Sequence, residues 1–236
     1  LDSAIDAVAP AVVPEATVVP LLNGMRHLDV LDARFGVSNV TGGLARVGVA
    51  MSPKGEILHT SPFATISFGE RDGKAARPVL GELGAAVRKA GIDGGLHGNI
   101  IQDLWDKWIM LCTLATMCCL MRGTSGDILE AAEGQAIMLE TLEECRKVAA
   151  AAGCDPGEKG MANVRSFLTQ KGSRFAASML HDLEQGAMVE AEHVVGDMIQ
   201  RAKLAGIPTP NLRLAYAHLQ VYLARRARGG IGKPAP

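Results

Sequence analysis

The stretch LWDKWIMLCTLATMCCLM, residues 104–121, decides the second half of the fold. Its last fourteen residues carry no charge, and the charge that precedes them is Lys107, which stands between two tryptophans. A run of fourteen is too short to span a bilayer, which takes about 20 residues, so the pattern predicts a buried core helix. We expect this helix to begin at Asn99 as its cap and to end at Gly123.

The composition indicates a soluble protein of one large or two smaller domains, in 236 residues. Lys and Arg number 24 against 25 Asp and Glu, and no basic stripe or acidic block argues for nucleic acid as a partner. The five cysteines form no C-x-x-C pair and sit among apolar residues, which predicts buried, reduced thiols in a cytoplasmic protein. The first residues show no secretory signal and no initiator Met, so we expect a fragment or a processed product.

The chain changes character near residue 98. The first part, 1–98, has short β-rich runs between Gly and Pro, and the second part, 99–236, has long helical patterns. The predicted fold class is therefore α/β followed by all-α.

In the first part we expect a helix, a buried strand of the parallel-sheet kind, an antiparallel set with a turn at 53–55, and a helix that Gly91 closes. Their predicted ranges are Asp2–Ala9; Val18–Leu22; Thr41–Met51, Glu56–Thr60 and Ala64–Phe68; and Pro78–Ala90.

In the second part, helices are expected between breaks at Gly153, Gly186 and Gly206. After the helix that ends at Met121, their ranges are Asp127–Ala152, Glu158–Thr169, Ser178–Glu184, Val189–Ala205 and Asn211–Arg228.

A dinucleotide-binding unit carries G-x-G-x-x-G between a strand and a helix, and no stretch of this sequence matches. Gly94-Gly95-Leu96-His97-Gly98 has the wrong spacing. If the first part is Rossmann-like, its phosphate-binding half lies upstream of Leu1.

Lys107 has two interpretations. Helical spacing puts Lys107, Leu111 and Ala115 on one face, where partial desolvation would lower the pKa of the lysine and suit a general acid. Alternatively the lysine stem lies along the surface and the ammonium group reaches water, and the residues alone favour this second interpretation.

The other candidates are also ambiguous by themselves. Glu190 and Glu192 lie on different helix faces, and an ordinary acidic first turn explains both. Together with His193 they lack H-E-x-x-H spacing, so no metal site is expected. Ser178 lacks the G-x-S-x-G elbow of a nucleophile but could donate to a substrate carboxylate. Asn23 follows a predicted strand, where it is either a ligand contact or part of a turn.

The order of the motifs is more specific than any one of them. It resembles the ketopantoate reductase family (2-dehydropantoate 2-reductases) from Leu1 to about His218. The motifs that carry the resemblance are VVPLLNGMRHLDVL, KGEILHT, LWDKW, TSGDI, SMLHDLEQGAMVEAE and AGIPTPNLRL. The resemblance implies a partial Rossmann-like domain, a helical substrate and dimerisation domain, and NADPH-dependent reduction of a 2-keto acid, 2-dehydropantoate to pantoate in pantothenate biosynthesis.

By the same resemblance, Lys107 is the catalytic proton donor, and Glu190 orients the substrate and lies near the nicotinamide ribose. Ser178 and Ser125 bind substrate. Asn23 contacts substrate and cofactor, and Ala50 is a small residue beside the cofactor. These roles are implied by the family's motifs.

Four positions depart from the family. Ser125, which precedes Gly126, is a polar substitute for the asparagine of the family's Asn-Gly pair. Leu111 and Ala115 stand where the family has asparagines, and Phe175 where some members have a polar residue. Loss of two carboxamides removes hydrogen bonds to a hydroxylated keto acid and can change the substrate. Two alternatives therefore remain open, namely a dehydrogenase for a more apolar keto acid and a non-catalytic helical dimerisation or ligand-binding module. The long apolar helices favour a homodimer.

Overall fold

The computed structural model describes residues 1–52 and 54–230, and of Pro62 and Phe63 only the backbone. The chain divides into two compact units, Leu1–Leu104 and a second that starts at Trp105, and each is described by itself. The turn predicted at 53–55 falls partly outside the described residues, and the domain boundary predicted at 98/99 stays a prediction.

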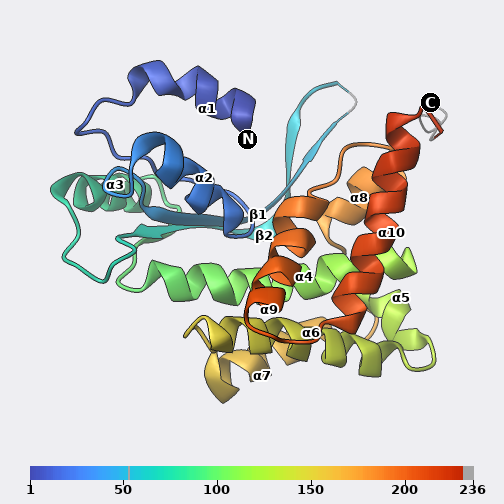
Figure 1. Ribbon diagram of the computed structural model, residues 1–236. Coiled ribbons are helices and arrows are strands. Elements are labelled where there is room, and N and C mark those ends of the chain that lie inside the picture. The colour runs from blue at the N-terminus through green and yellow to red at the C-terminus, as the bar shows by residue number, and fades with distance from the viewer. Residues whose placement is uncertain (53, 231–236) are drawn as a thin grey trace. The chain divides into compact units, whose positions relative to one another are not determined.

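The first unit is α/β, as predicted, with a mixed three-stranded sheet in the order β1-β2-β3 (Figure 1). β1 and β2 are antiparallel, and β2 and β3 are parallel. Before α4 its elements are α1 (Asp2–Val8), the 3-10 turn η1 (Ala9–Ala11), α2 (Arg26–Phe35), β1 (Gly42–Met51), β2 (Ile57–Gly69), α3 (Pro78–Lys89) and β3 (Asp93–Leu96).

The core of this unit lies between the sheet and α3. Phe68 of β2 packs with Leu80 and Val87 of α3, all buried. Two ion pairs close the edge of the unit: Arg71 binds Asp32 of α2 at 2.6 Å, and Arg77 binds Glu70 at 2.7 Å. The guanidinium of Arg77 lowers the pKa of the Glu70 carboxyl.

The strand predictions are corrected in two places. The segment Val18–Leu22 is not a buried strand: it makes a single parallel bridge, Val18 to Val40, and Leu21 and Leu22 are exposed. Pro20 in its middle has no N–H to give to a ladder. The two runs predicted after residue 55 form one continuous strand, β2.

Besides the short turn η1, two elements of the first unit, α2 and β3, were not predicted. α2 follows the Asn23-Gly24 bend and ends at Gly36, which has a φ of 86°. β3 holds Gly94 and Gly95, whose poor strand propensity hid it. Gly94 is needed because a Cβ there would collide with the carbonyl oxygen of Ile66 on the neighbouring strand.

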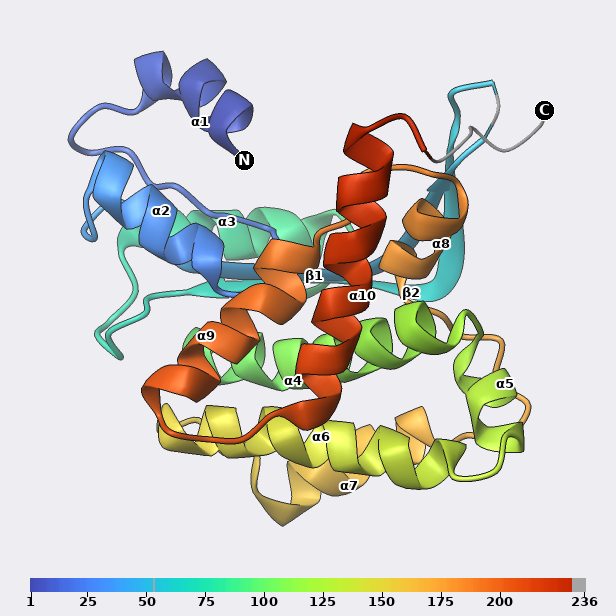
Figure 2. The ribbon, with the colours of Figure 1, turned by 45° about the vertical axis from the view of Figure 1, so that its right-hand side comes forward.

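The second unit is all-helical, as predicted (Figure 2). With α4, which begins at the end of the first unit, its elements are α4 (Ile100–Met121), α5 (Ser125–Glu130), α6 (Gly134–Ala151), α7 (Gly157–Leu168), α8 (Ser178–Glu184), the π-helical turn η2 (Glu192–Gly196), α9 (Asp197–Leu204) and α10 (Pro210–Ala227).

α4 runs through the core of the second unit, with α6 alongside it and α10 across it (Figures 1 and 2). The Thr141 hydroxyl of α6 donates to the sulfur of Met117 in α4. Although 22 residues would suffice to cross a bilayer, 67% of the most apolar window of α4 is buried, as in the core helix of a soluble protein. The predicted core helix is confirmed, with the Asn99 side chain accepting from the Gln102 N–H.

The predicted starts of two helices are also corrected. The helix predicted over 127–152 is two helices, because Thr124 and Asp127 form a capping box that starts α5 and Glu133 takes a φ of 65° before α6. The helix predicted from Val189 begins only at Ala191, so Glu190 lies just ahead of it.

Four of the five cysteines are buried, as predicted, and Cys154 is half-buried. Burial raises the pKa of the Cys118 thiol to about 11 and that of Cys119 to about 12, which keeps both protonated and unreactive at neutral pH.

Glu144 of α6 caps α10 from the side. Its carboxylate accepts hydrogen bonds from the Asn211 and Leu212 N–H groups at 3.0 and 3.1 Å, and Glu144 is buried. We expect Glu144→Ala to lower the free energy of unfolding by about 1–3 kcal/mol, because the buried Leu212 N–H and the partly buried Asn211 N–H lose their acceptor. Urea denaturation checks this against Glu143→Ala, a neighbouring and more exposed carboxylate that should change it by less than about 0.5 kcal/mol. Equal effects would show that the cap does not matter.

Candidate active site

The six predicted site residues are divided between the units. Lys107, Ser125, Ser178 and Glu190 belong to the second, and Asn23 and Ala50 to the first. Within the second unit, hydrogen bonds join Trp108, next to Lys107, to the turn that starts with Glu190. Other hydrogen bonds join Ser125 to the segment just before Ser178. Their roles remain predictions.

Lys107 is half-buried on α4, between two buried tryptophans. The rings of Trp105 and Trp108 lie 4.9 Å apart, and the Arg201 guanidinium of α9 lies 5.9 and 5.6 Å from their centroids. Arg201 is balanced by the buried Asp197, 3.1 Å away. The aromatic flanks of the lysine therefore anchor α4 against α9, which fixes the helix from which Lys107 projects.

The Trp108 side chain links the two predicted catalytic residues. Its indole N–H donates to the Val194 carbonyl at 2.9 Å, in a buried position. The Val194 N–H in turn donates to the Glu190 carbonyl at 3.0 Å. The turn of α4 that carries Lys107 is thus joined to the turn that starts with the exposed Glu190.

Ser125 and Ser178 are the first residues of the short helices α5 and α8. Backbone hydrogen bonds connect the start of α5 to the segment that precedes α8. The Ser125 N–H, at the start of α5, donates to the Phe175 carbonyl, and the Gly126 N–H donates to that of Ser173, both at 2.9 Å. Ser178, the first residue of α8, is exposed and free to meet a ligand, whereas Ser125 is only 2% exposed. Ser178 is therefore the better placed of the two to bind substrate.

Asp182 is a carboxylate that the sequence interpretation missed. Burial raises its pKa, the charge of Glu190 raises it further, and His181 opposes the shift. The interaction shows that α8 and Glu190 lie near one another. Asp182 is the last residue of the SM-x-x-D motif, and that motif was the available signal.

In the first unit, Asn23 is half-buried in the bend after the Val18 bridge, while Ala50 lies exposed near the free end of the β1–β2 hairpin. Gly43 abuts the Pro20 carbonyl. Ala50 is seven residues farther along β1, roughly 20 Å at about 3.3 Å per residue, so the structure does not bring it to Asn23.

Leu111 and Ala115, which stand where the family has asparagines, differ in access. Leu111 is half-buried, whereas Ala115 is only 1% exposed. Leu111 therefore offers side-chain surface to a ligand, and Ala115 belongs to the packed interior.

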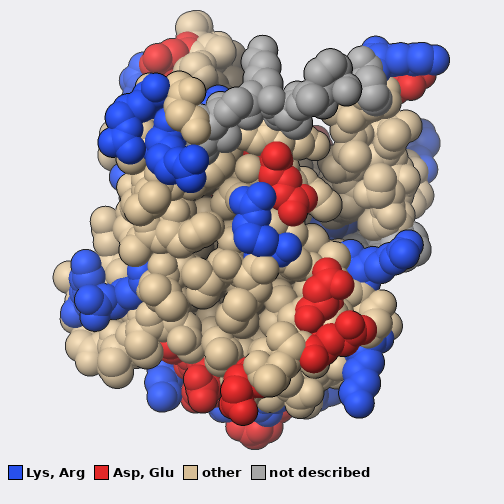
Figure 3. Space-filling view, turned by 90° about the vertical axis from the view of Figure 1, so that its right-hand side faces the viewer, with Lys and Arg blue, Asp and Glu red and all other residues tan. Residues whose placement is uncertain are grey.

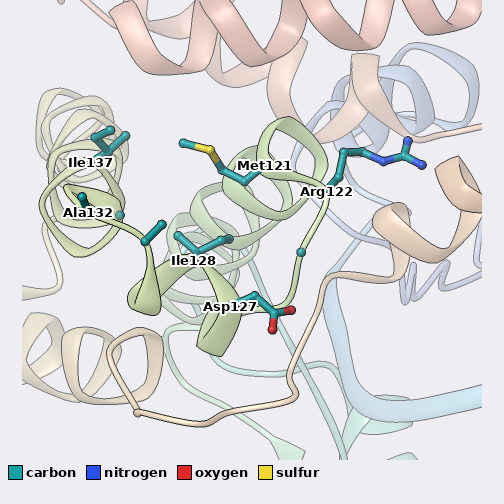
Figure 4. Close-up of a pocket in the computed structure, with 9 residues that line it drawn as sticks. Met121, Arg122, Asp127, Ile128, Ala132 and Ile137 are labelled. Atoms are coloured by element: carbon teal, nitrogen blue, oxygen red, sulfur yellow. The ribbon is translucent and has the colours of Figure 1, made fainter.

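A pocket of about 290 Å³ lies between the end of α4, α5 and the start of α6. Figure 4 shows the Met121 side chain directed toward Ile137 and Arg122 directed away. The pocket is mostly apolar, and none of the six predicted residues lines it. We therefore place the candidate site on the residues joined by Trp108 and not on this pocket.

Charges of both signs are interspersed on the face in Figure 3. In the described part of the chain, no cluster of three or more His, Cys, Asp or Glu could hold a metal ion.

A partial Rossmann-like α/β unit followed in the chain by a helical unit is the fold class that the sequence predicted. Residues 99–223 match the profile described as "Ketopantoate reductase PanE/ApbA C terminal", and residues 1–73 match "Ketopantoate reductase PanE/ApbA". The chain belongs to the ketopantoate reductase family, which confirms the resemblance read from its motifs.

Individual relatives support the same family assignment. An uncharacterized oxidoreductase of Bacillus subtilis is 31% identical over 96% of this chain and 74% of its own length. A 2-dehydropantoate 2-reductase of Halobacterium salinarum is 24% identical over 84% of this chain and 64% of its own length. The structure of a 2-dehydropantoate 2-reductase from Methylococcus capsulatus aligns with a TM-score of 0.81, at 26% identity, over 94% of this chain and 71% of that one. The chain thus spans about two thirds to three quarters of these relatives.

The charge of Glu190 predicts a pH effect at Asp182. A raised pKa penalises the ionised form, so Asp182 costs the fold nothing at acid pH and costs stability as pH rises from its ordinary value of 3.8 through its raised one. We expect Glu190→Gln to lower the pKa of Asp182, observed by NMR titration. Glu184→Gln, an exposed carboxylate on the same helix, is the control. A pKa that does not move in Glu190→Gln would contradict the interaction.

Proposed function

We propose that the full-length protein reduces a 2-keto acid to a 2-hydroxy acid with NADPH, 2-dehydropantoate being the first candidate substrate. The observation that carries the proposal is the hydrogen-bonded link from the turn of Lys107 through Trp108 and Val194 to Glu190. Family membership supports the reaction class.

Observations within each unit support the proposed roles separately. Asn23 follows a parallel-bridged segment, the position at which open α/β sheets meet ligands. Asn23, Ala50 and Glu190 would lie beside a nicotinamide cofactor, which when bound would supply the hydride to the carbonyl carbon. Lys107 gives its proton to the carbonyl oxygen as negative charge develops there. Ser178 donates to the substrate carboxylate, and Glu190 orients the substrate.

Lys107→Ala tests this role in the full-length protein. We expect turnover to fall by about 10²–10⁴, the usual contribution of a general acid, because no other group is assigned to protonate the oxygen. Cofactor affinity should change by less than about threefold, since truncation of Lys107 leaves the hydride donor's contacts in place.

The assay follows NADPH and NADH absorbance with ketopantoate, and fluorescence titration gives cofactor affinity. Lys159→Ala, an exposed lysine on α7, is the matched control. Unchanged turnover in Lys107→Ala would refute the assignment.

A second candidate function is reduction of a more apolar 2-keto acid, favoured by the accessible apolar side chain of Leu111. Trimethylpyruvate, which is ketopantoate without its hydroxyl group, makes the comparison direct. We expect Leu111→Asn to raise kcat/KM for ketopantoate relative to trimethylpyruvate by about five- to tenfold, the worth of one hydrogen bond. Met110→Asn, a half-buried neighbour on another face of α4, should leave the ratio unchanged. A wild-type preference for ketopantoate would reject this candidate.

The proposal also includes a homodimer in the cytoplasm. Leu214 and Val221, seven residues apart on one face of α10, are each 60% exposed, which supports a contact there. Sedimentation velocity tests it, and a monomer at micromolar concentration would reject it.

A further inference from the structure

Glu190 lies two residues before the π-helical turn η2, with only Ala191 between them. Its defining bond runs from the Asp197 N–H to the Glu192 carbonyl, five residues back. Such turns are rare, and they often occur at functional sites. Because one residue occupies about 100° of an α-helix, the extra residue in η2 rotates whatever precedes it relative to α9. The direction in which the chain presents Glu190 is therefore set by η2.

Three side chains from two other helices, α4 and α10, hold η2. The Trp108 indole of α4 donates to the Val194 carbonyl at 2.9 Å, in the middle of the turn. From α10, the Tyr216 hydroxyl and the Gln220 amide donate to the Glu192 carboxylate at 2.6 and 2.7 Å.

The packing around η2 leaves little freedom. Gly196 faces Tyr216, and a Cβ there would come within 3.1 Å of the ring and 3.0 Å of the Glu192 carboxylate. Val194, Val195 and Gly196 are buried. An ordinary α-helical register would move the Val194 carbonyl and the Glu192 carboxylate away from their donors.

These contacts give Glu190 and Glu192 different environments. Glu192 is bound to α10, whereas Glu190 stands exposed ahead of the turn. We propose that Trp108 and Glu192 are positioning residues, which lock the π-helical register and so hold Glu190 in a fixed place relative to Lys107. This inference rests on the proposed function for its catalytic consequence.

Trp108→Phe tests the inference in the full-length protein, since it keeps an aromatic ring and removes the N–H donor. We expect kcat to fall by about tenfold or more, because a small displacement of an orienting group costs much of its effect. KM for the keto acid and for the cofactor should change by less than about threefold. Amide hydrogen exchange should accelerate in residues 190–197.

Substitutions of Glu192 provide an independent test of the inference. Glu192→Ala should reproduce the loss of kcat, and Glu192→Gln, which still offers an oxygen to Tyr216, should recover most of it. Thr141→Val is the matched structural control, because it removes a buried hydroxyl that donates to the Ile137 carbonyl and Met117. It should lower stability and leave kcat and exchange in 190–197 unchanged.

The outcomes separate this inference from the proposed function. Loss of kcat in Trp108→Phe no larger than in Thr141→Val, or unchanged exchange in 190–197, would overturn it. If the wild-type protein reduces no 2-keto acid with either nucleotide, the proposed function fails. Hydrogen exchange in Trp108→Phe then still tests whether the indole stabilises η2. Faster exchange in residues 190–197 would support this stabilisation, and unchanged exchange would refute it.

Discussion

The second unit depends on the removal of α4 from water. Most of its most apolar window is buried, and at about 25 cal/mol per Å² of apolar surface this is the largest single gain that the helix can make. The other helices are arranged to cover it. The buried Trp108 N–H of this helix is satisfied by the Val194 carbonyl, 86 residues away in the sequence. Burial of α4 thereby holds the Trp108 indole against the middle of η2.

Much of the fold could be predicted from the sequence because local rules and packing agree there. Asn99 caps α4, Gly91 closes α3, and Gly153, Gly186 and Gly206 all take the positive φ that ends a helix. Long runs of apolar residues with few breakers identified the helices of the second unit. Strand predictions were weaker, because Val18–Leu22 is apolar in sequence but has a partner at only one residue.

The rest depended on contacts between distant parts of the chain. Nothing local distinguishes η2 from an α-helix, since its register is held by Trp108 and Tyr216 from other helices. Likewise the 127–152 pattern is helical throughout, and the break comes from a cap at Thr124 and a left-handed Glu133. The candidate residues came from the order of the motifs, and the relation of Asp182 to Glu190 required the fold.

The tryptophan pair has a further consequence. The chain contains two tryptophans, and both flank Lys107 with their rings 4.9 Å apart. Intrinsic indole emission from this chain therefore originates at the candidate site alone, beside a guanidinium group that stacks on both rings. The fluorescence of Trp105 and Trp108 therefore serves as an intrinsic probe of changes in polarity around Lys107.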